Sequence, residues 1–215
     1  MRIVGGKWRG RAIESPEGRG TTRPTTDRTR EAIASMVLSA CALDLSGRSV
    51  LDAFAGSGAM ALELVSRGAE RATCVDRDRR ACQRIARTAR ALGAAEGEVR
   101  AVFGDVFQLV ERGLLGAPFG VVFLDPPYAV DAARVSALVD VLAETGQLAL
   151  GAVVVYEHAA KAAGLSCTHV AVERARTRGI STVELGIFEP APEAAAESAP
   201  APSEPEPLSE SETLS

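Results

Sequence analysis

The sequence predicts an α/β fold, with a mostly parallel sheet covered by helices on both faces. Short apolar segments alternate with amphipathic ones through the central part of the chain, an order typical of strands linked by helical crossovers. A glycine-rich turn joins the first of these strands to its helix, and an acidic residue closes each of four successive strands. Open α/β sheets bind their ligands at the carboxyl ends of the strands, so these acids also predict the position of a site.

The periodicity of apolar residues places the expected elements along the chain. After an amino-terminal hairpin, helices are expected near residues 26–41, 58–67, 78–92, 106–113 and 130–145. Strands are expected near residues 49–54, 71–76, 99–104, 119–125, 152–158, 167–174 and 182–188. Only a short link, residues 177–181, separates the last two strands, so they are expected to pair as an antiparallel hairpin at the end of a seven-stranded sheet.

A basic hairpin is expected within an amino-terminal extension, residues 1–24. Gly5 and Gly6 lie between two extended segments and favour a tight turn. The period of two in strands places three basic side chains on one face, opposite Trp8: Lys7, Arg9 and Arg11. Like charges on one face repel one another unless a polyanion neutralises them, so we expect RNA to bind here. The alternative is an ordinary solvated face, with Trp8 covering the core.

Positive charge is concentrated at the amino end. Residues 1–30 contain eight basic and three acidic residues, a net charge of +5, whereas the whole chain carries −4. In the helix expected near residues 26–41, Arg28 and Arg30 lie in the first turn, where cations oppose the helix dipole, and this favours a ligand for them. An ion pair from Arg28 to Glu31 is the alternative. The predicted phosphate-binding set is Lys7, Arg9, Arg11, Arg23, Arg28 and Arg30.

A glycine turn follows the strand expected near residues 49–54. Gly56 and Gly58 allow positive φ and a close approach of a ligand to the backbone, and the amides of the next helix can bind a polar or anionic group. The turn is Gly-x-Gly rather than the Gly-x-Gly-x-x-Gly of dinucleotide folds, although Ala61 occupies a position at which that motif tolerates alanine. On this turn alone, a redox enzyme with a nicotinamide cofactor stays open.

Acidic residues close four strands: Asp52, Asp76, Asp105 and Asp125. Asp76 follows the glycine turn by about twenty residues, where parallel α/β sites hold the ribose hydroxyls of a nucleotide. Asp105 is placed to accept a hydrogen bond from an adenine amino group. Each acid alone is more often a helix cap or a solvated strand end. Together they indicate a ligand site at one edge of the sheet.

The tetrapeptide Asp125-Pro126-Pro127-Tyr128 follows the apolar run of residues 121–124. Proline has no N–H, so this loop offers carbonyl oxygens and a carboxylate with few competing donors. Such an acceptor-rich pocket suits an amino group conjugated to a ring or a carbonyl, whose hydrogens must be held while the nitrogen attacks an electrophile. Tyr128 can stack on a planar substrate. Taken alone, the motif is also ordinary turn chemistry.

These motifs resemble those of a known family. The order Asp-x-Phe-x-Gly-x-Gly, Val-Asp, Gly-Asp and Asp-Pro-Pro-Tyr is similar to that of S-adenosylmethionine-dependent methyltransferases of the class I, Rossmann-like fold, in the branch that acts on exocyclic amines. The segments at residues 1–11 and 23–31, the second with Arg-Pro-Thr-Thr-Asp-Arg, narrow the resemblance to bacterial small-subunit ribosomal RNA guanine-N2 methyltransferases of the type that modifies guanine 966. The resemblance runs from residue 1 to about residue 189.

The resemblance implies a direct transfer of a methyl group from S-adenosylmethionine to guanine N2 in 16S rRNA, within the small ribosomal subunit or its assembly intermediate. It implies a catalytic loop of Asp125, Pro126, Pro127 and Tyr128. It also implies a set of cofactor-binding residues: Asp52, Phe54, Gly56, Gly58, Asp76, Arg77, Asp105 and Val106. No metal is expected. Residues 176–179 lack the aromatic residue that the family tends to carry before its last strand, which puts a base contact from this loop in doubt.

Three other functions stay open. DNA adenine and release-factor glutamine methyltransferases share the Asp-Pro-Pro-Tyr motif and would keep the same core. A non-catalytic binder in ribosome assembly would use the basic segment alone. A nicotinamide-dependent redox function would leave the Asp-Pro-Pro-Tyr loop unexplained.

Composition predicts one globular domain, residues 25–189, in a chain of 215 residues with 47% hydrophobic and 24% charged residues. No apolar run approaches the roughly 18 residues of a membrane span, and no signal peptide is recognised. We therefore expect a cytoplasmic monomer with no membrane partner. The four cysteines lack Cys-x-x-Cys spacing and are expected to be reduced thiols. The acidic, proline-rich tail, residues 190–215, is expected to be disordered.

Overall fold

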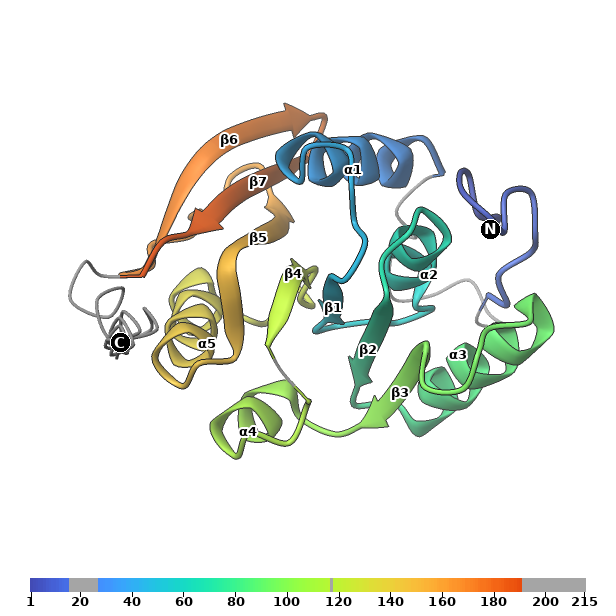
Figure 1. Cartoon of the computed structure of the whole chain (residues 1–215). Helices are drawn as coiled ribbons and strands as arrows, with labels where there is room; N and C mark the ends of the chain where they lie inside the picture. Colours follow the sequence, from blue (N-terminus) through green and yellow to red (C-terminus); the bar gives the residue numbers. More distant parts are fainter. Residues whose placement is uncertain (16–26, 117, 191–215) are drawn as a thin grey trace, which may run out of the picture.

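The computed structural model describes residues 1–15, 27–116 and 118–190 and contains a seven-stranded sheet (Figure 1). The strands are β1 (Ser49–Asp52), β2 (Arg71–Asp76), β3 (Val99–Phe103), β4 (Phe119–Leu124), β5 (Leu148–Ala159), β6 (Val170–Arg178) and β7 (Ser181–Phe188). The helices are α1 (Asp27–Ala40), α2 (Ala59–Ser66), α3 (Arg79–Leu92), α4 (Val106–Glu111) and α5 (Ala132–Glu144). Each of these elements was predicted from the sequence, with ends that differ by at most four residues.

The strands lie in the order β3-β2-β1-β4-β5-β7-β6. β3, β2, β1, β4 and β5 run parallel, and β7 lies antiparallel to both β5 and β6. The antiparallel pair at the end of the chain was predicted from the short link between its strands. The Rossmann-like class I methyltransferase fold expected from the sequence is confirmed.

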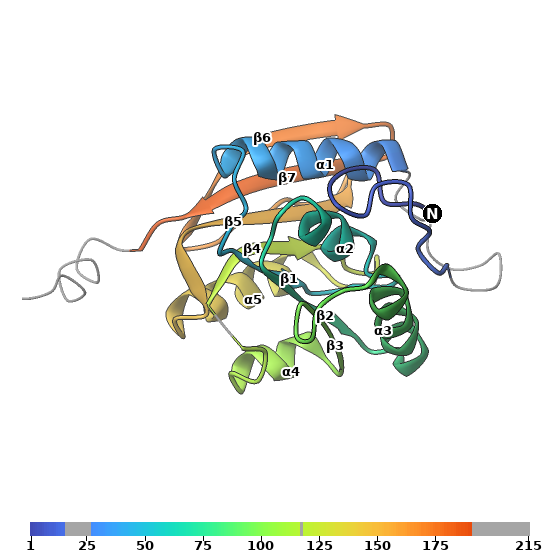
Figure 2. The same ribbon diagram turned by 45° about the vertical axis from the view of Figure 1, so that its right-hand side comes forward.

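Helices cover both faces of the sheet (Figure 2). α1, α2 and α3 pack on one face, and α4 and α5 pack on the other. Side chains alternate along each strand, so Val121 and Phe123 of β4 point to the first layer of helices and Val122 and Leu124 to the second. A parallel strand that is buried on both faces is apolar throughout, which explains the continuous apolar run that precedes the Asp-Pro-Pro-Tyr loop.

The amino-terminal segment, residues 1–15, differs from the expected hairpin in its turn. Its two ends pair antiparallel through a bridge between Arg2 and Ala12, but residues 5–10 form turns rather than strands. Contacts with α2 account for the difference, since the amide of Lys7 donates to the carbonyl of Ser66 at 2.7 Å. Gly6 has a φ of +76°, and a Cβ there would lie 1.8 Å from that carbonyl oxygen. The glycine therefore permits close packing on α2.

A buried carboxylate holds this segment in place. Glu63 of α2 accepts hydrogen bonds from the amides of Val4 and Gly5, each at 2.8 Å. Two arginines neutralise its charge, with Arg67 Nε at 2.7 Å and Arg30 Nε at 3.5 Å. A buried carboxylate is tolerated when it is paired and hydrogen-bonded in this way. The amino-terminal segment is therefore fixed against α1 and α2.

Candidate functional site

Four acidic side chains lie at the carboxyl ends of neighbouring parallel strands, and we call them the acidic edge: Asp52, Asp76, Asp125 and Glu157. The residue two positions before each acid packs against the helices α1, α2 and α3. These four residues are Val50, Cys74, Phe123 and Val155. Because side chains alternate along a strand, all four acids belong to the same face of the sheet. The sequence analysis predicted the three aspartates and missed Glu157.

Asp52 lies beneath the glycine turn. Its side chain is only 2% exposed, and its Oδ2 accepts a hydrogen bond from the amide of Ala61 at 3.3 Å. Burial, reinforced by the negative charges of Asp125 and Asp76, raises the pKa of Asp52 to about 7, although the Ala61 amide acts in the opposite direction. Asp52 therefore ionises near neutral pH.

The glycine turn requires glycine at both predicted positions. Gly56 and Gly58 have φ values of +54° and +71°. A Cβ on Gly58 would lie 3.0 Å from Cγ1 of Ile85, whereas a Cβ on Gly56 would meet no atom within 4 Å. Gly58 is also the N-cap of α2; it has no side chain to cap that helix, and Asp52 instead accepts from the amide of Ala61 in the first turn. The turn thus leaves open space beside Gly56, next to a helix end suited to an anionic group.

Asp76 and Asp105 accept hydrogen bonds from groups of the protein itself. The carboxylate of Asp76 accepts from the amides of Gly56 and Asp78, each at 2.7 Å. Asp105 caps α4 by accepting from the amide of Phe107 at 3.0 Å, and it pairs with Arg77. The helix cap that was the alternative reading of Asp105 is therefore present.

Two of the predicted cofactor-binding residues are apolar and lie near α4. Val106 is buried at the start of that helix, and Phe54 is half-buried with its ring centroid 6.0 Å from that of Phe107. They provide an apolar wall beside Asp105. The structure thus brings the predicted cofactor-binding residues of the loops after β1, β2 and β3 together at one edge.

The Asp-Pro-Pro-Tyr loop closes on itself directly after β4. The amide of Val130 donates to the carbonyl of Pro127 at 2.9 Å, and Tyr128 is 81% exposed. Burial is the larger cause and the negative charge of Glu157 the smaller cause that together raise the pKa of Asp125 to about 7. The loop therefore presents an aromatic ring to solvent beside a carboxyl group that ionises near neutral pH.

Glu157 lies near the end of β5, beside the Asp-Pro-Pro-Tyr loop. Its Oε1 accepts from the hydroxyl of Ser181 on β7 at 2.9 Å. Its Oε2 is buried and has no hydrogen-bond partner among the residues that the structure describes. A sequence signal for this residue existed: Val153 and Val155 point to the core, and Glu157 is the next residue in that alternation.

Arg30 does not belong to a phosphate-binding surface, and this prediction was wrong. Its side chain is 1% exposed, and it pairs with Asp27 at 2.9 Å and with Glu63 at 3.5 Å. It also donates to the carbonyl of Arg2. Glu63 lies on a different helix, and its buried charge explains why an arginine occupies the inner face of α1.

The remaining predicted phosphate ligands are dispersed. Arg9 and Arg28 are exposed, whereas Lys7 pairs with Glu98 and Arg11 donates to a backbone carbonyl, that of Ala91, at 2.6 Å. Residues 5–10 are turns, so the strand that was expected to bring Lys7, Arg9 and Arg11 to one face is absent. Trp8 is buried in the core, as the alternative of an ordinary solvated face had it. Arg23 lies outside the described residues.

A larger basic surface, which the sequence analysis missed, lies on α3. This helix contains five arginines and no acidic residue. The amino-terminal segment is attached to it, since Glu14 pairs with Arg87 at 2.6 Å and its amide donates to the hydroxyl of Thr88 at 3.4 Å. The α3 arginine surface comprises Arg80, Arg84, Arg87 and Arg90 of the helix and Arg11 of the attached segment. Arg84 is half-buried and pairs with Asp78 at 3.3 Å. The sequence contained a signal for this surface, because the arginines recur at the spacing of the outer, polar face of an amphipathic helix.

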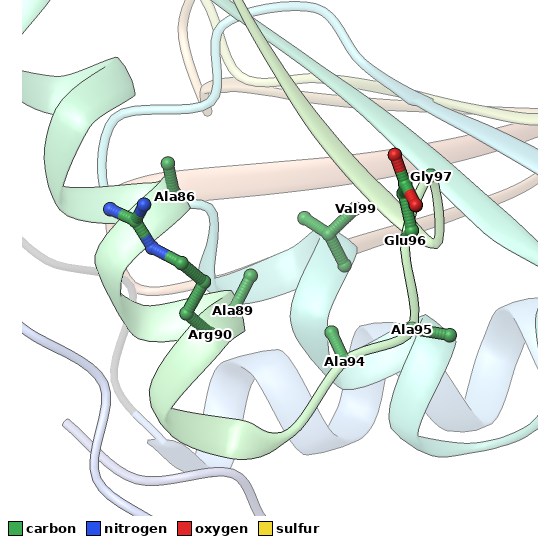
Figure 3. Close-up of a pocket in the computed structure, with 8 residues that line it drawn as sticks. All are labelled: Ala86, Ala89, Arg90, Ala94, Ala95, Glu96, Gly97 and Val99. Carbon is green, nitrogen blue, oxygen red and sulfur yellow. The ribbon is translucent and has the colours of Figure 1, made fainter.

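A pocket of about 390 Å³ opens beside this surface (Figure 3). Arg90 and Glu96 lie at opposite sides of it, and small residues of α3 and the loop before β3 form its floor. It is located at the amino end of β3, opposite the acidic edge. The pocket therefore does not belong to the site formed by the strand ends.

Residues 1–15, 27–116 and 118–190 contain no group of three or more His, Cys, Asp or Glu side chains that could hold a metal ion. Over the same residues, none of the helices has the length and apolar character needed to span a bilayer.

Comparison with known proteins adds independent findings. A family model described as "Conserved hypothetical protein 95" matches residues 1–187. The ribosomal RNA small subunit methyltransferase D of Escherichia coli K12 is 38% identical over 128 residues, which are 60% of this chain and 60% of that protein. The match therefore spans less than two thirds of that relative. The YlbH protein of Bacillus subtilis is 33% identical over 163 residues, which are 74% of this chain and 82% of that protein.

Solved structures share the fold. The yhhF structure from Escherichia coli is 29% identical, with a TM-score of 0.72 over 88% of this chain and 98% of that chain. An RNA methyltransferase from Salinibacter ruber, solved with S-adenosyl-L-homocysteine, has a TM-score of 0.56 over 84% of this chain and 97% of that chain. At 19% identity, the second likeness supports the fold alone.

Proposed function

Because the chain belongs to the family described as Conserved hypothetical protein 95, we propose that it methylates the N2 amino group of a guanine in 16S rRNA, using S-adenosylmethionine. The similarity to the ribosomal RNA small subunit methyltransferase D of Escherichia coli supports rRNA as the substrate. The observation that carries the chemistry is the acceptor-rich loop of Asp125, Pro126, Pro127 and Tyr128 beside the glycine turn. The proposed target is guanine 966, in the small subunit or its assembly intermediate.

The residues of the acidic edge and the glycine turn fit S-adenosylmethionine. The open space beside Gly56, next to the amino end of α2, suits its methionine part. Asp76 is placed to accept from the ribose hydroxyls, because each carboxylate oxygen can accept more than the one amide it now binds. Asp105 would accept from the adenine amino group, with Phe54 and Val106 against the ring. When bound, the cofactor supplies a methyl group on a sulfonium, whose thioether is already a good leaving group.

Asp125 and the Pro126 carbonyl hold the two hydrogens of guanine N2 in this proposal. Accepting both hydrogens increases the lone-pair character of the nitrogen, which is otherwise delocalised into the ring. As the new N–C bond forms, one N–H proton passes to the carboxylate of Asp125. A carboxyl group with a pKa of about 7 suits this transfer, since a general base works best when its pKa is near the working pH.

Tyr128 stacks on the target base in this proposal. Its ring is exposed at the mouth of the loop, where a guanine taken out of its RNA stack would arrive. Aromatic stacking of this kind is how proteins usually hold splayed bases of RNA and flipped bases.

The α3 arginine surface binds the phosphates of the RNA. α3 begins beside the acidic edge, three residues after Asp76, and its 14 residues span about 21 Å. The arginines from Arg80 to Arg90 cover about 15 Å of this length, so they can neutralise several phosphates of one strand. Arg9 and Arg28 are exposed and can extend this contact, whereas Arg30 is not part of it.

Transfer of tritium from labelled S-adenosylmethionine tests the proposal. Small subunits from a strain that lacks this gene are compared with naked rRNA, DNA and release factor, and the product is identified by nucleoside analysis. We expect N2-methylguanosine in the 16S rRNA of the subunit. Label in adenine or in glutamine would transfer the proposal to the corresponding class of methyltransferase. Absence of label in all four, with measurable cofactor binding, would favour a non-catalytic binder.

A further inference from the structure

The second carboxylate of the site, Glu157, is held at the level of Asp125. β4 and β5 are parallel, and their register pairs Phe123 with Val155 and Leu124 with Tyr156. The next pair in that register is Asp125 with Glu157, so the two side chains leave the same face of the sheet. Neighbouring strands are separated by about 4.8 Å. One base bound at the carboxyl ends of β4 and β5 can therefore meet both carboxylates.

Glu157 has an unused acceptor. Ser181 occupies Oε1, and Oε2 is buried without a hydrogen-bond partner among the described residues. Buried acceptors in folded proteins are almost always paired, and an unpaired one calls for an explanation. Asp125 offers no donor when it is ionised, as the proposed reaction requires. A donor from the substrate would complete the hydrogen bonding of Glu157 once the side chain turns this buried oxygen toward the site.

Guanine provides such a donor next to its amino group. Its Watson–Crick edge carries the N2 amine and the adjacent ring N1–H, so three hydrogens lie side by side. Adenine and cytosine place an unprotonated ring nitrogen beside their amines, and uracil has no amine. A second carboxylate beside the amine acceptors therefore fits guanine and repels the lone pair of adenine N1 or cytosine N3.

We infer that Glu157 accepts the N1–H of the target base and restricts methyl transfer to guanine. This inference rests on the proposed function and assigns it a specificity-determining residue. The Asp-Pro-Pro-Tyr loop alone holds any conjugated amine, whereas Glu157 reads the ring position beside it. Sites built to bond a substrate N–H reject analogues that lack it by up to about 10⁴-fold.

Small subunits reconstituted with altered bases at the target position test this inference. 2-Aminopurine keeps the 2-amino group but has an unprotonated N1, whereas 6-thioguanine keeps N1–H and changes only the atom at position 6. We expect the wild-type protein to prefer guanine to 2-aminopurine by at least about 10²-fold in kcat/KM, and to accept 6-thioguanine nearly as well as guanine. Equal use of guanine and 2-aminopurine by the wild type would overturn the inference without any variant.

The variant Glu157→Gln provides the second test of the inference. Its amide can donate to N1 of 2-aminopurine, so the preference for guanine should fall at least tenfold while cofactor affinity stays unchanged. Glu184→Gln is the matched control, because Glu184 is a half-buried carboxylate on neighbouring β7 whose bond to the Leu165 amide lies on the other face of the sheet. The control should keep the wild-type preference.

The outcomes separate the inference from the proposed function. Wild-type transfer to guanine with an unchanged preference in Glu157→Gln would overturn the role of Glu157 and leave the proposed function standing. Absence of transfer to guanine by the wild type would overturn both.

Discussion

The acidic edge and the α3 arginine surface are both rich in ionisable side chains, but those of the edge are buried or half-buried and those of α3 are mostly exposed to solvent. Asp52 is the last residue of β1 and Asp125 directly follows β4, and burial raises the pKa of each to about 7. The arginines of α3 lie on the outer face of a helix, and in the ion pair between Arg87 and Glu14 both side chains are exposed to solvent. Exposed ion pairs are screened by water and salt and contribute little to stability.

The difference indicates what each region can do. The carboxylates of the acidic edge are held by the ends of buried strands and are shielded from water, so they can orient a reacting group. Their loss should therefore reduce turnover. Charges on a solvated helix act through attraction over a distance, so their loss should reduce affinity in a salt-dependent way. The two regions can be separated experimentally along these lines.

The largest effect is expected from Asp125→Ala. Removal of the carboxylate that accepts an N2 hydrogen and takes the proton should reduce single-turnover methyl transfer by about 10³-fold. Binding of S-adenosylmethionine and the salt dependence of RNA binding should stay as in the wild type. Asp125→Asn is the control that keeps one acceptor but cannot take a proton, and it should be nearly as slow. Turnover close to that of the wild type in purified Asp125→Ala would remove the proposed role.

Asp52→Asn should stabilise the folded protein at high pH. Since the pKa of Asp52 rises from 3.8 to about 7 on folding, the folded state binds more protons between these values, and stability falls as pH rises through this window. An asparagine avoids the buried charge, so the variant should gain about 2–4 kcal/mol of unfolding free energy at pH 8 and little near pH 4. Urea unfolding at the two pH values measures this. A variant that is less stable than the wild type at pH 8 would contradict the assignment.

The acidic edge and the basic residues near the amino end differ in how far the sequence could predict them. The strand ends were predictable because parallel strands bring their carboxyl ends to one edge, so Asp52, Asp76 and Asp125 could be grouped without coordinates. Glu157 could have been added from the alternation of β5. By contrast, Arg30 was misassigned because its partner Glu63 lies on another helix, and no local pattern reports that contact.

The amino-terminal segment shows a second limit of local patterns. Its basic residues and two adjacent glycines fit a hairpin, but hydrogen bonds to Ser66 and Glu63 determine the turns. These partners lie about sixty residues away in the sequence. The fold class, which depends on periodicity, was therefore easier to predict than the shape of a loop, which depends on distant partners.

Removal of arginines from α3 should reduce affinity without reducing the chemical rate. The triple variant Arg80→Ala, Arg87→Ala and Arg90→Ala should bind rRNA about tenfold more weakly at low salt. Loss of up to three phosphate contacts should also reduce the slope of log Kd against log salt by about 2. Single-turnover transfer at saturating RNA should be unchanged.

A control with the same change of net charge is available on β6. Arg174, Arg176 and Arg178 are exposed on this edge strand, far along the sheet from α3. Their replacement by alanine removes the same total charge, so a general loss of attraction would affect both variants equally. Equal weakening would contradict a specific role for the α3 arginine surface.

The smallest effect, a shift of the pH profile, links the geometry of the acidic edge to its electrostatics. Asp125 must be ionised to accept the N2 hydrogens, so kcat/KM should rise as pH increases through about 7. The charge of Glu157 on β5 raises the pKa of Asp125, and the charge of Asp125 in turn raises the pKa of Asp52 on β1. Glu157→Gln removes one of these charges, so the acid limb should move to lower pH by less than about one unit. A flat profile between pH 6 and 8 in the wild type, or a limb that moves to higher pH in the variant, would show that the electrostatics of this edge do not control the reaction.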